Sequence, residues 1–186
     1  DHASNTPFRL YKHFVHEGGM SSPLVVHWPA GIPKQKLGSF VEQFGYLPDF
    51  MPTCIELAGA DYPRRWNDRP IHPMAGESLV PLIEGGNEPV HSEPVFWEHE
   101  GNRAMRDGRW KLVWAGEGPW ELFDTDADRT EMKNLFESMP RRAADMKRTW
   151  ESWARRTSVQ FQTSFSYYKM IGDYTKTQNL KPDPDH

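Results

Sequence analysis

The spacing of apolar and polar residues divides the chain into two regions, and the second region has the clearer pattern. It contains four short apolar runs separated by glycine-containing polar stretches, at residues 94–98, 103–106, 110–114 and 120–123. Runs of this length, bounded by turn residues, are typical of β-strands. Asp107-Gly108 separates two of these runs, and glycine provides the positive φ that a tight hairpin turn requires. We therefore predict an antiparallel sheet of three or four strands.

A helix is predicted to follow this sheet, from about residue 140 to residue 156. Its apolar residues recur every three or four positions and form one stripe along a helix, comprising Met139, Ala143, Met146, Trp150 and Trp153. Pro140 lies in the first turn, which tolerates proline. Because such a stripe must be buried against another element, we expect it to pack on the preceding sheet. The polar and aromatic residues that follow are expected to form an extended tail.

The first region carries weaker signals. The apolar run at residues 24–28 is closed by Pro29 and Gly31, which predicts a short buried strand. A helix is predicted from Asp49 to Gly59, with an apolar face formed by Phe50, Cys54, Leu57 and Ala58. On this face, Cys54 is expected to be a small core residue. Residues 60–75 have the composition of a loop, in which Arg64-Arg65-Trp66 is expected to be solvated, and residues 79–83 predict a short helix.

Composition excludes several classes of protein. The 186 residues suffice for one domain or slightly more, and their 8 Trp, 6 Tyr and 10 Phe indicate packed structure. Basic and acidic residues are interleaved and give a net charge of −4, so nucleic-acid binding has little support. No apolar run approaches the roughly 20 residues that span a membrane. The single cysteine excludes an internal disulfide and a cysteine-based zinc site.

A loop before residues 24–28 carries the most informative polar residues. Lys12, His13 and His16 precede Glu17-Gly18-Gly19, and the apolar run follows. Ligands in open α/β sheets gather where loops meet strand ends, so this cationic loop is a candidate anion site. The glycines are expected to adopt φ values closed to other residues. The two histidines lack a third ligand in the sequence, so we predict no metal site from them.

A second polar segment, residues 124–128, alternates aspartate with other residues, as calcium-binding loops do. The sixth position of the loop is Arg129 instead of glycine, and the twelfth is Leu135 instead of glutamate. An EF-hand requires both of those residues. We therefore predict a turn between a strand and a helix.

Motifs occur in a fixed order between residues 5 and 135. They are Lys12 with Glu17-Gly18-Gly19; Asp49, Pro52, Thr53, Leu57, Ala58 and Gly59; Gly76, Ser78, Leu79, Pro81 and Leu82; Ala104, Arg106, Gly108, Trp110, Lys111 and Leu112; and Glu121–Asp124 with Glu131, Asn134 and Leu135. In this order, they resemble the sulfatases of the alkaline-phosphatase superfamily, the arylsulfatase-like enzymes. Each motif alone is weak, but their joint order and spacing are specific.

This resemblance implies an α/β fold that becomes α+β in its C-terminal half. Residues 1–90 would form the end of an alkaline-phosphatase-like core domain. Residues 91–157 would form a small C-terminal subdomain, an antiparallel sheet packed on a helix. Residues 158–186 would form a polar and aromatic tail, which no family motif covers.

The resemblance also implies hydrolysis of sulfate esters by a formylglycine nucleophile. A calcium ion, held by Asp and Asn oxygens, would polarise the sulfate. Cys54 is followed by Ile55-Glu56-Leu57-Ala58, which is not the modification motif, and no calcium ligands are recognised in this chain. The chain begins at Asp1 without methionine, which fits an internal fragment or a trimmed chain. We expect the nucleophile and the calcium ligands upstream, and the chain alone to be inactive.

Three residues are assigned to the site by this resemblance. Lys12 matches the family lysine whose ammonium contacts a sulfate oxygen, so it is the predicted catalytic residue. His13 could line the substrate pocket, although a loop or packing role is the alternative, and His99 is assigned to the rim of the cleft. The expected partners are a sulfate-ester substrate, either a sulfated glycan or an aryl sulfate, and the upstream part of the enzyme. A periplasmic or secreted location is also implied.

Two other functions stay open on the sequence. Phosphate and sulfate are similar tetrahedral anions, so a phosphodiesterase or phosphonate monoester hydrolase of the same superfamily is one alternative. A non-enzymatic module that binds glycans or a protein partner is the other, because the chain has many tryptophans and lacks the nucleophile motif.

Overall fold

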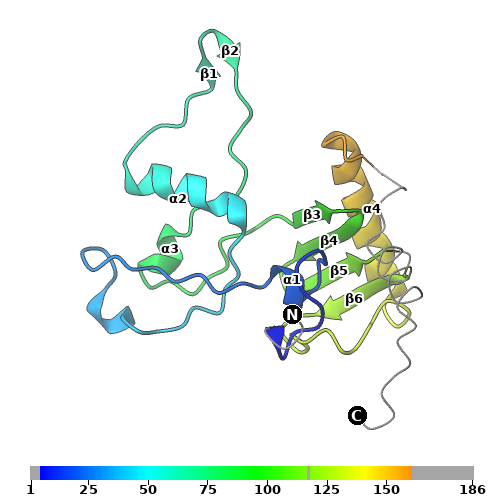
Figure 1. Cartoon of the computed structure of the whole chain (residues 1–186). Helices are drawn as coiled ribbons and strands as arrows, with labels where there is room; N and C mark the ends of the chain where they lie inside the picture. Colours follow the sequence, from blue (N-terminus) through cyan, green and yellow to red (C-terminus); the bar gives the residue numbers. More distant parts are fainter. Residues whose placement is uncertain (1–4, 117, 161–186) are drawn as a thin grey trace, which may run out of the picture. The chain divides into compact units, whose positions relative to one another are not determined.

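The computed structural model describes residues 5–116 and 118–160 (Figure 1). The chain forms two compact units: Asp1–Ser22 together with Pro94–His186, and Pro23–Glu93. The predicted tail lies outside the described residues except for its first three, and the predicted domain boundaries at residues 90 and 157 stay predictions. None of the described helices is long and apolar enough to cross a membrane.

A four-stranded antiparallel sheet forms the centre of the first unit. Its strands follow one another in chain order: β3 (Val95–His99), β4 (Asn102–Asp107), β5 (Trp110–Trp114) and β6 (Trp120–Asp124). Gly108 has φ 55° in the turn between β4 and β5, which confirms the predicted hairpin. The predicted sheet and the predicted α/β composition are therefore confirmed.

Helix α4 (Pro140–Arg156) covers one face of this sheet (Figure 1). The core between them contains three strand residues and four helix residues, namely Met105, Leu112, Leu122, Ala143, Met146, Trp150 and Ala154. Cross-strand pairing places Leu112 between Met105 and Leu122, so the three side chains form a row on one face of the sheet. The predicted helix and its packing partner are confirmed.

The N-terminal segment covers the opposite face of the sheet. Val15 packs with Ala104, Val113 and Phe123 in a second buried cluster, and the short helix α1 (Glu17–Met20) follows. Residues of β5 alternate between the two faces, so Leu112 faces α4 while Val113 faces the N-terminal segment. Both faces of the small sheet are thus buried.

The second unit is built from short elements joined by long loops. In chain order they are η2 (Lys34–Lys36), η3 (Leu47–Asp49), α2 (Phe50–Leu57), β1 (Arg65–Trp66), β2 (Arg69–Pro70) and α3 (Val80–Ile83). β1 and β2 form a small exposed antiparallel ribbon. The predicted helices at residues 49–59 and 79–83 are confirmed as α2 and α3.

Asp49 and Thr53 organise this second unit. The fully buried Asp49 carboxylate accepts hydrogen bonds from the backbone N–H groups of Tyr46 (2.6 Å) and Glu77 (2.9 Å), and it lies 2.9 Å from His91 Nε2. The Thr53 hydroxyl donates to the Asp49 carbonyl (2.6 Å) and accepts from the backbone N–H of Leu79 (2.9 Å). The Asp and Thr of the second motif therefore have structural roles, because they join η3 and α2 to the segment that leads into α3.

Two predictions for this unit are wrong. Residues 24–28 form no strand, and Val25 is 87% exposed, because no described segment pairs with this run. Cys54 is exposed, whereas Pro52 and Thr53 are the buried residues of α2. In both places the apolar pattern predicts burial, but the described chain supplies no surface to bury it against.

Trp150 provides a test of the sheet–helix core. It is fully buried, and its indole N–H donates to the Trp97 carbonyl (3.2 Å). We expect Trp150→Ala to lower the free energy of unfolding by about 3–5 kcal/mol, because it leaves a large cavity. Trp66→Ala is the matched control, since Trp66 is 68% exposed. Equal effects of the two substitutions in chemical denaturation would contradict the described packing.

Candidate functional site

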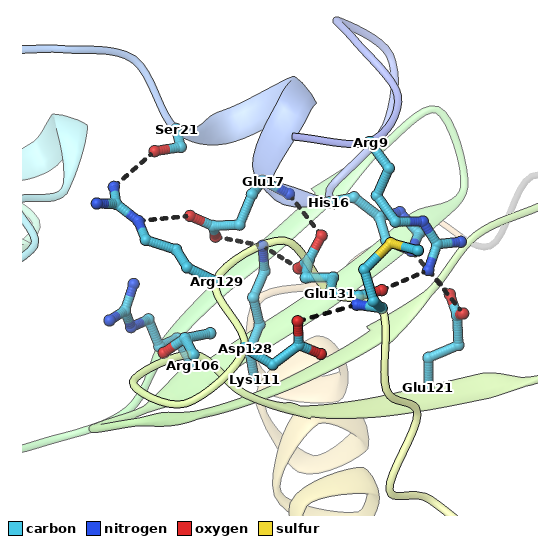
Figure 2. A network of polar contacts seen from close by, with 12 residues as sticks. Arg9, His16, Glu17, Ser21, Arg106, Lys111, Glu121, Asp128, Arg129 and Glu131 are labelled. Carbon is cyan, nitrogen blue, oxygen red and sulfur yellow. Dashed lines mark hydrogen bonds and ion pairs between the residues drawn. The ribbon is translucent and has the colours of Figure 1, made fainter. Parts of the chain in front are cut away.

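A buried network of charges fixes the N-terminal loop to the sheet (Figure 2). Lys111 of β5 is fully buried, and its ammonium donates to Glu17 Oε1 at 2.7 Å and lies 2.8 Å from Glu131 Oε1. Both carboxylates are almost completely buried as well. Since an unpaired buried ammonium is very unfavourable, Lys111 requires these partners to be present.

Glu131 joins the three segments of this network. Its second carboxylate oxygen accepts the backbone N–H of Glu17 at 2.8 Å, at the start of α1. Its backbone carbonyl accepts from the Arg9 guanidinium at 2.9 Å. Arg129, two residues earlier, lies 3.9 Å from the other Glu17 oxygen and donates to the Ser21 hydroxyl. The loop that follows β6 therefore holds both ends of the 9–21 segment.

Glu121 forms a second group of polar contacts with the 9–21 segment. Glu121 of β6 accepts from Arg9 at 3.3 Å, and its Oε2 lies 2.7 Å from Nε2 of the buried His16. His16 therefore packs beneath the loop with Glu121 as its partner (Figure 2), as expected for a residue with a structural role. His13 has a different partner, Glu100.

The charges of the network lower the pKa values of two of its carboxyls, those of Glu17 and Glu121. Burial raises the pKa of Glu17, but the charge and hydrogen bond of Lys111, with the charges of Arg106 and Arg129, outweigh burial, and the pKa is lowered. Burial likewise raises the pKa of Glu121, but His16 and Arg9 outweigh it and lower the pKa. Each carboxylate is therefore more stable ionised in the fold than in water.

Gly18 and Gly19 allow the loop to fold back closely on itself. A Cβ at Gly18 would lie 2.2 Å from the Arg9 carbonyl oxygen, and one at Gly19 would lie 2.0 Å from that of Phe14. Neither glycine has a positive φ, so the predicted reason for these glycines is wrong. Glycine is required here because backbone atoms approach too closely for any side chain.

The structure brings two of the predicted site residues together. His13 lies in the 9–21 segment and stacks on His99 at the end of β3, with ring centroids 6.2 Å apart. Glu100, in the turn between β3 and β4, places its Oε2 2.7 Å from His13 Nδ1 and its Oε1 3.9 Å from His99 Nε2. Lys12, the third predicted residue, precedes His13 and is exposed.

Sequence reasoning missed Glu100 and Asn102 as members of this site. Asn102 is buried, donates to the His13 carbonyl at 2.6 Å and accepts the backbone N–H of Gly116 at 2.9 Å. Its position next to a glycine at a strand start is the sequence signal that could have found it. Glu100 adjoins His99 in sequence, but nothing local indicates that it faces His13.

The arrangement can bind an anion or a metal ion. The exposed Lys12 ammonium can attract an anion, and an imidazole N–H can donate a hydrogen bond to one. Among the described residues, the group with metal-ligand spacing is His13, His99 and Glu100, whose ligand atoms all lie within 4.8 Å of one another. The aspartates at residues 124–128 have other partners: Asp124 pairs with Arg109, and Asp128 accepts backbone N–H groups of its own turn.

Comparison with known proteins places this architecture in one family. The family model "N-sulphoglucosamine sulphohydrolase, C-terminal" matches residues 8–155. An uncharacterized sulfatase of Schizosaccharomyces pombe is 30% identical over 164 residues, which are 84% of this chain and 29% of that protein. Choline-sulfatase of Rhizobium meliloti is 34% identical over 69% of this chain and 24% of its own length.

Solved structures agree with this result. The crystal structure of Ps i-CgsB superposes with a TM-score of 0.68 and 26% identity, over 96% of this chain and 38% of that one. The same protein has been solved in complex with k-i-k-neocarrahexaose.

The family model and the relatives thus define a C-terminal region of sulfatase type. The chain belongs to the N-sulphoglucosamine sulphohydrolase C-terminal family, and its relatives are named sulfatases, so the resemblance in sequence is confirmed. It spans between 24% and 38% of the length of these relatives.

The substitution Lys111→Met tests whether the buried ammonium and its partners stabilise the fold. The substitution leaves Glu17 and Glu131 buried without their cation, so we expect a loss of about 3–5 kcal/mol in the free energy of unfolding. Lys133→Met, at an exposed lysine, is the control and should cost little. If chemical denaturation shows the same small effect for both variants, the network does not stabilise the fold.

The lowered pKa values predict the direction of acid denaturation. Glu17 and Glu121 stabilise the fold fully above their ordinary pKa of 4.5, and this contribution is lost as the pH falls through their lower pKa values in the fold. We expect the free energy of unfolding to fall by up to about 1.4 kcal/mol per pH unit for each carboxyl. Denaturation at a series of pH values measures this slope, and Glu17→Gln should reduce it. A stability that stays constant as the pH falls below 4.5 would contradict the assignment.

Proposed function

We propose that this chain supplies the electrostatic and substrate-facing part of a sulfuric ester hydrolase. The observation that carries the proposal is the loop that the buried network fixes to the sheet. In a chain of the sulfatase family, this loop carries the exposed Lys12 directly before His13, whose ring lies against His99 and Glu100. An exposed ammonium on a loop that a buried ionic network fixes to the sheet can stabilise charge on a transferred sulfate group.

In this proposal each site residue has a separate role. The Lys12 ammonium contacts a sulfate oxygen and stabilises negative charge as the ester bond breaks. His13 and His99 lie at the rim and donate hydrogen bonds to the substrate, while Glu100 accepts from His13 and fixes the orientation of its ring. A loop held by the buried network loses little entropy when the substrate binds.

The nucleophile and the calcium ion of the family are proposed to lie elsewhere in the enzyme. Calcium prefers six to eight oxygen ligands, whereas the described cluster offers two imidazoles and one carboxylate. These residues do not fit calcium, so no step of the reaction is assigned to it here. Cys54 lies outside the modification motif and belongs to the other compact unit.

The second unit exposes many large apolar residues, which supports the proposal that another part of the enzyme packs on it. Val25 is 87% exposed and Phe40 97%, and several other large apolar residues of this unit are exposed, namely Leu24, Val26, Leu37, Val41, Leu47, Phe50, Met51 and Leu57. So many exposed apolar side chains mark a surface that another part of a protein covers. We propose that the rest of the sulfatase core covers them, and that the chain alone is inactive.

The proposed substrate class is a sulfate ester, with a sulfated glycan favoured over a small aryl sulfate. Support comes from relatives named for sugar sulfates, such as N-acetylgalactosamine-6-sulfatase of Sus scrofa, which is 33% identical over 71% of this chain. The oligosaccharide complex of Ps i-CgsB points in the same direction.

Lys12→Ala in the complete enzyme tests the proposed role. Loss of one positioned charge that acts on the transferred group is expected to lower kcat by about 10²–10³-fold. Lys133→Ala, at another exposed lysine of the same unit, is expected to leave kcat within about twofold. Steady-state hydrolysis of a sulfate ester by both variants provides the measurement. An unchanged kcat in Lys12→Ala would remove the lysine from the mechanism.

A further inference from the structure

We propose that His13, His99 and Glu100 form a binding site for a divalent first-row transition-metal ion such as Zn²⁺. The three residues come from two segments far apart in sequence: the N-terminal 9–21 segment, and the end of β3 with the turn that follows it. The proposal goes beyond the proposed hydrolysis, because the residues bind such an ion whether or not the chain takes part in catalysis.

The positions of the ligand atoms support such a site. One nitrogen of each histidine and one oxygen of Glu100 all lie within 4.8 Å of one another. A tetrahedral ion with bonds of about 2.0–2.1 Å separates its ligand atoms by about 3.4 Å. His13 Nδ1 lies 2.7 Å from Glu100 Oε2, and His99 Nε2 lies 3.9 Å from Glu100 Oε1. Both imidazoles therefore lie at about this spacing from the same carboxylate.

The backbone around the cluster is held in an unusual conformation. His13 has φ 90° and Glu100 has φ 52°, both in the left-handed region that L residues rarely adopt. Such conformations persist only where surrounding contacts enforce them, and they gather at ligand sites. Asn102 holds the His13 carbonyl, and the Glu98 carboxylate accepts the backbone N–H of Gly101 at 2.8 Å. The ligand residues are thus preorganised on both segments.

The donor set determines which ions fit. Imidazole nitrogens favour zinc, copper and nickel, whereas calcium and magnesium require a shell of oxygen ligands. Two histidines and one glutamate also leave a fourth position for water, as in zinc sites of open type. A His13–Glu100 ion pair alone would not require His99 to stack on the same ring. An ion shared by both imidazoles accounts for all three positions.

The site shares residues with the proposed substrate rim. An ion bound to both imidazoles would occupy the nitrogens that are proposed to face the substrate, so metal and substrate would compete for them. Zinc binding can be measured in the absence of substrate, so the metal site can be tested without a measurement of hydrolysis.

Isothermal titration of the purified chain with ZnCl₂ tests the proposal. We expect binding of one ion by this cluster, weakened at least about tenfold in His99→Gln and in His13→Asn, since even the partners of metal ligands contribute 10–100-fold to affinity. His99 is exposed, so its substitution should not disturb folding, and asparagine tolerates the positive φ of residue 13. His72→Gln, at an exposed histidine of the other unit, should leave the affinity unchanged.

A titration with CaCl₂ under the same conditions should show no binding at this cluster. Absence of zinc binding by the unsubstituted chain, or equal zinc affinity in His99→Gln and the unsubstituted chain, would overturn the proposal. Zinc binding through His99, together with an unchanged kcat of Lys12→Ala in the complete enzyme, would leave this proposal intact and count only against the proposed hydrolysis.

Discussion

The burial of one ammonium group, that of Lys111, constrains much of the first unit. A charged group away from water is stable only with close partners of opposite charge, and Lys111 has one carboxylate from each of two other segments. Glu17 comes from the N-terminal loop and Glu131 from the loop that follows β6. The sheet, the loop and the connection to α4 are therefore joined at one point.

This junction explains how a short loop can present functional groups in a defined place. One face of the sheet packs on α4 through Trp150 and its neighbours, and the other face carries the charged network. The network holds the segment from Arg9 to Ser21 at both ends, so Lys12 and His13 lie between fixed points. Asn102 then fixes the His13 backbone beside the turn that carries His99 and Glu100. Rigid support of this kind is what the proposed sulfate site requires.

Local patterns in the sequence predict the strands, the hairpin at Gly108 and helix α4, because each depends on near neighbours. The motifs containing Glu17, Lys111 and Glu131 are also visible in the sequence, but their meeting in one network depends on the arrangement of distant segments. The stacking of His13 on His99 is hidden for the same reason. The predicted strand at residues 24–28 fails because its pattern indicates burial against a surface that the described chain does not contain. Trp150 also weakens the alternative of a glycan-binding module, since this aromatic residue lies in the core.

We propose that the loop fixed by Lys111 places Lys12 against the sulfate group of a substrate. A crystal structure of the complete enzyme with a sulfate ester bound tests this placement directly. We expect the Lys12 ammonium to lie within hydrogen-bond distance, about 3 Å, of a sulfate oxygen, with the Lys111–Glu17–Glu131 contacts intact. A bound sulfate group remote from Lys12, with the loop still in place, would contradict it.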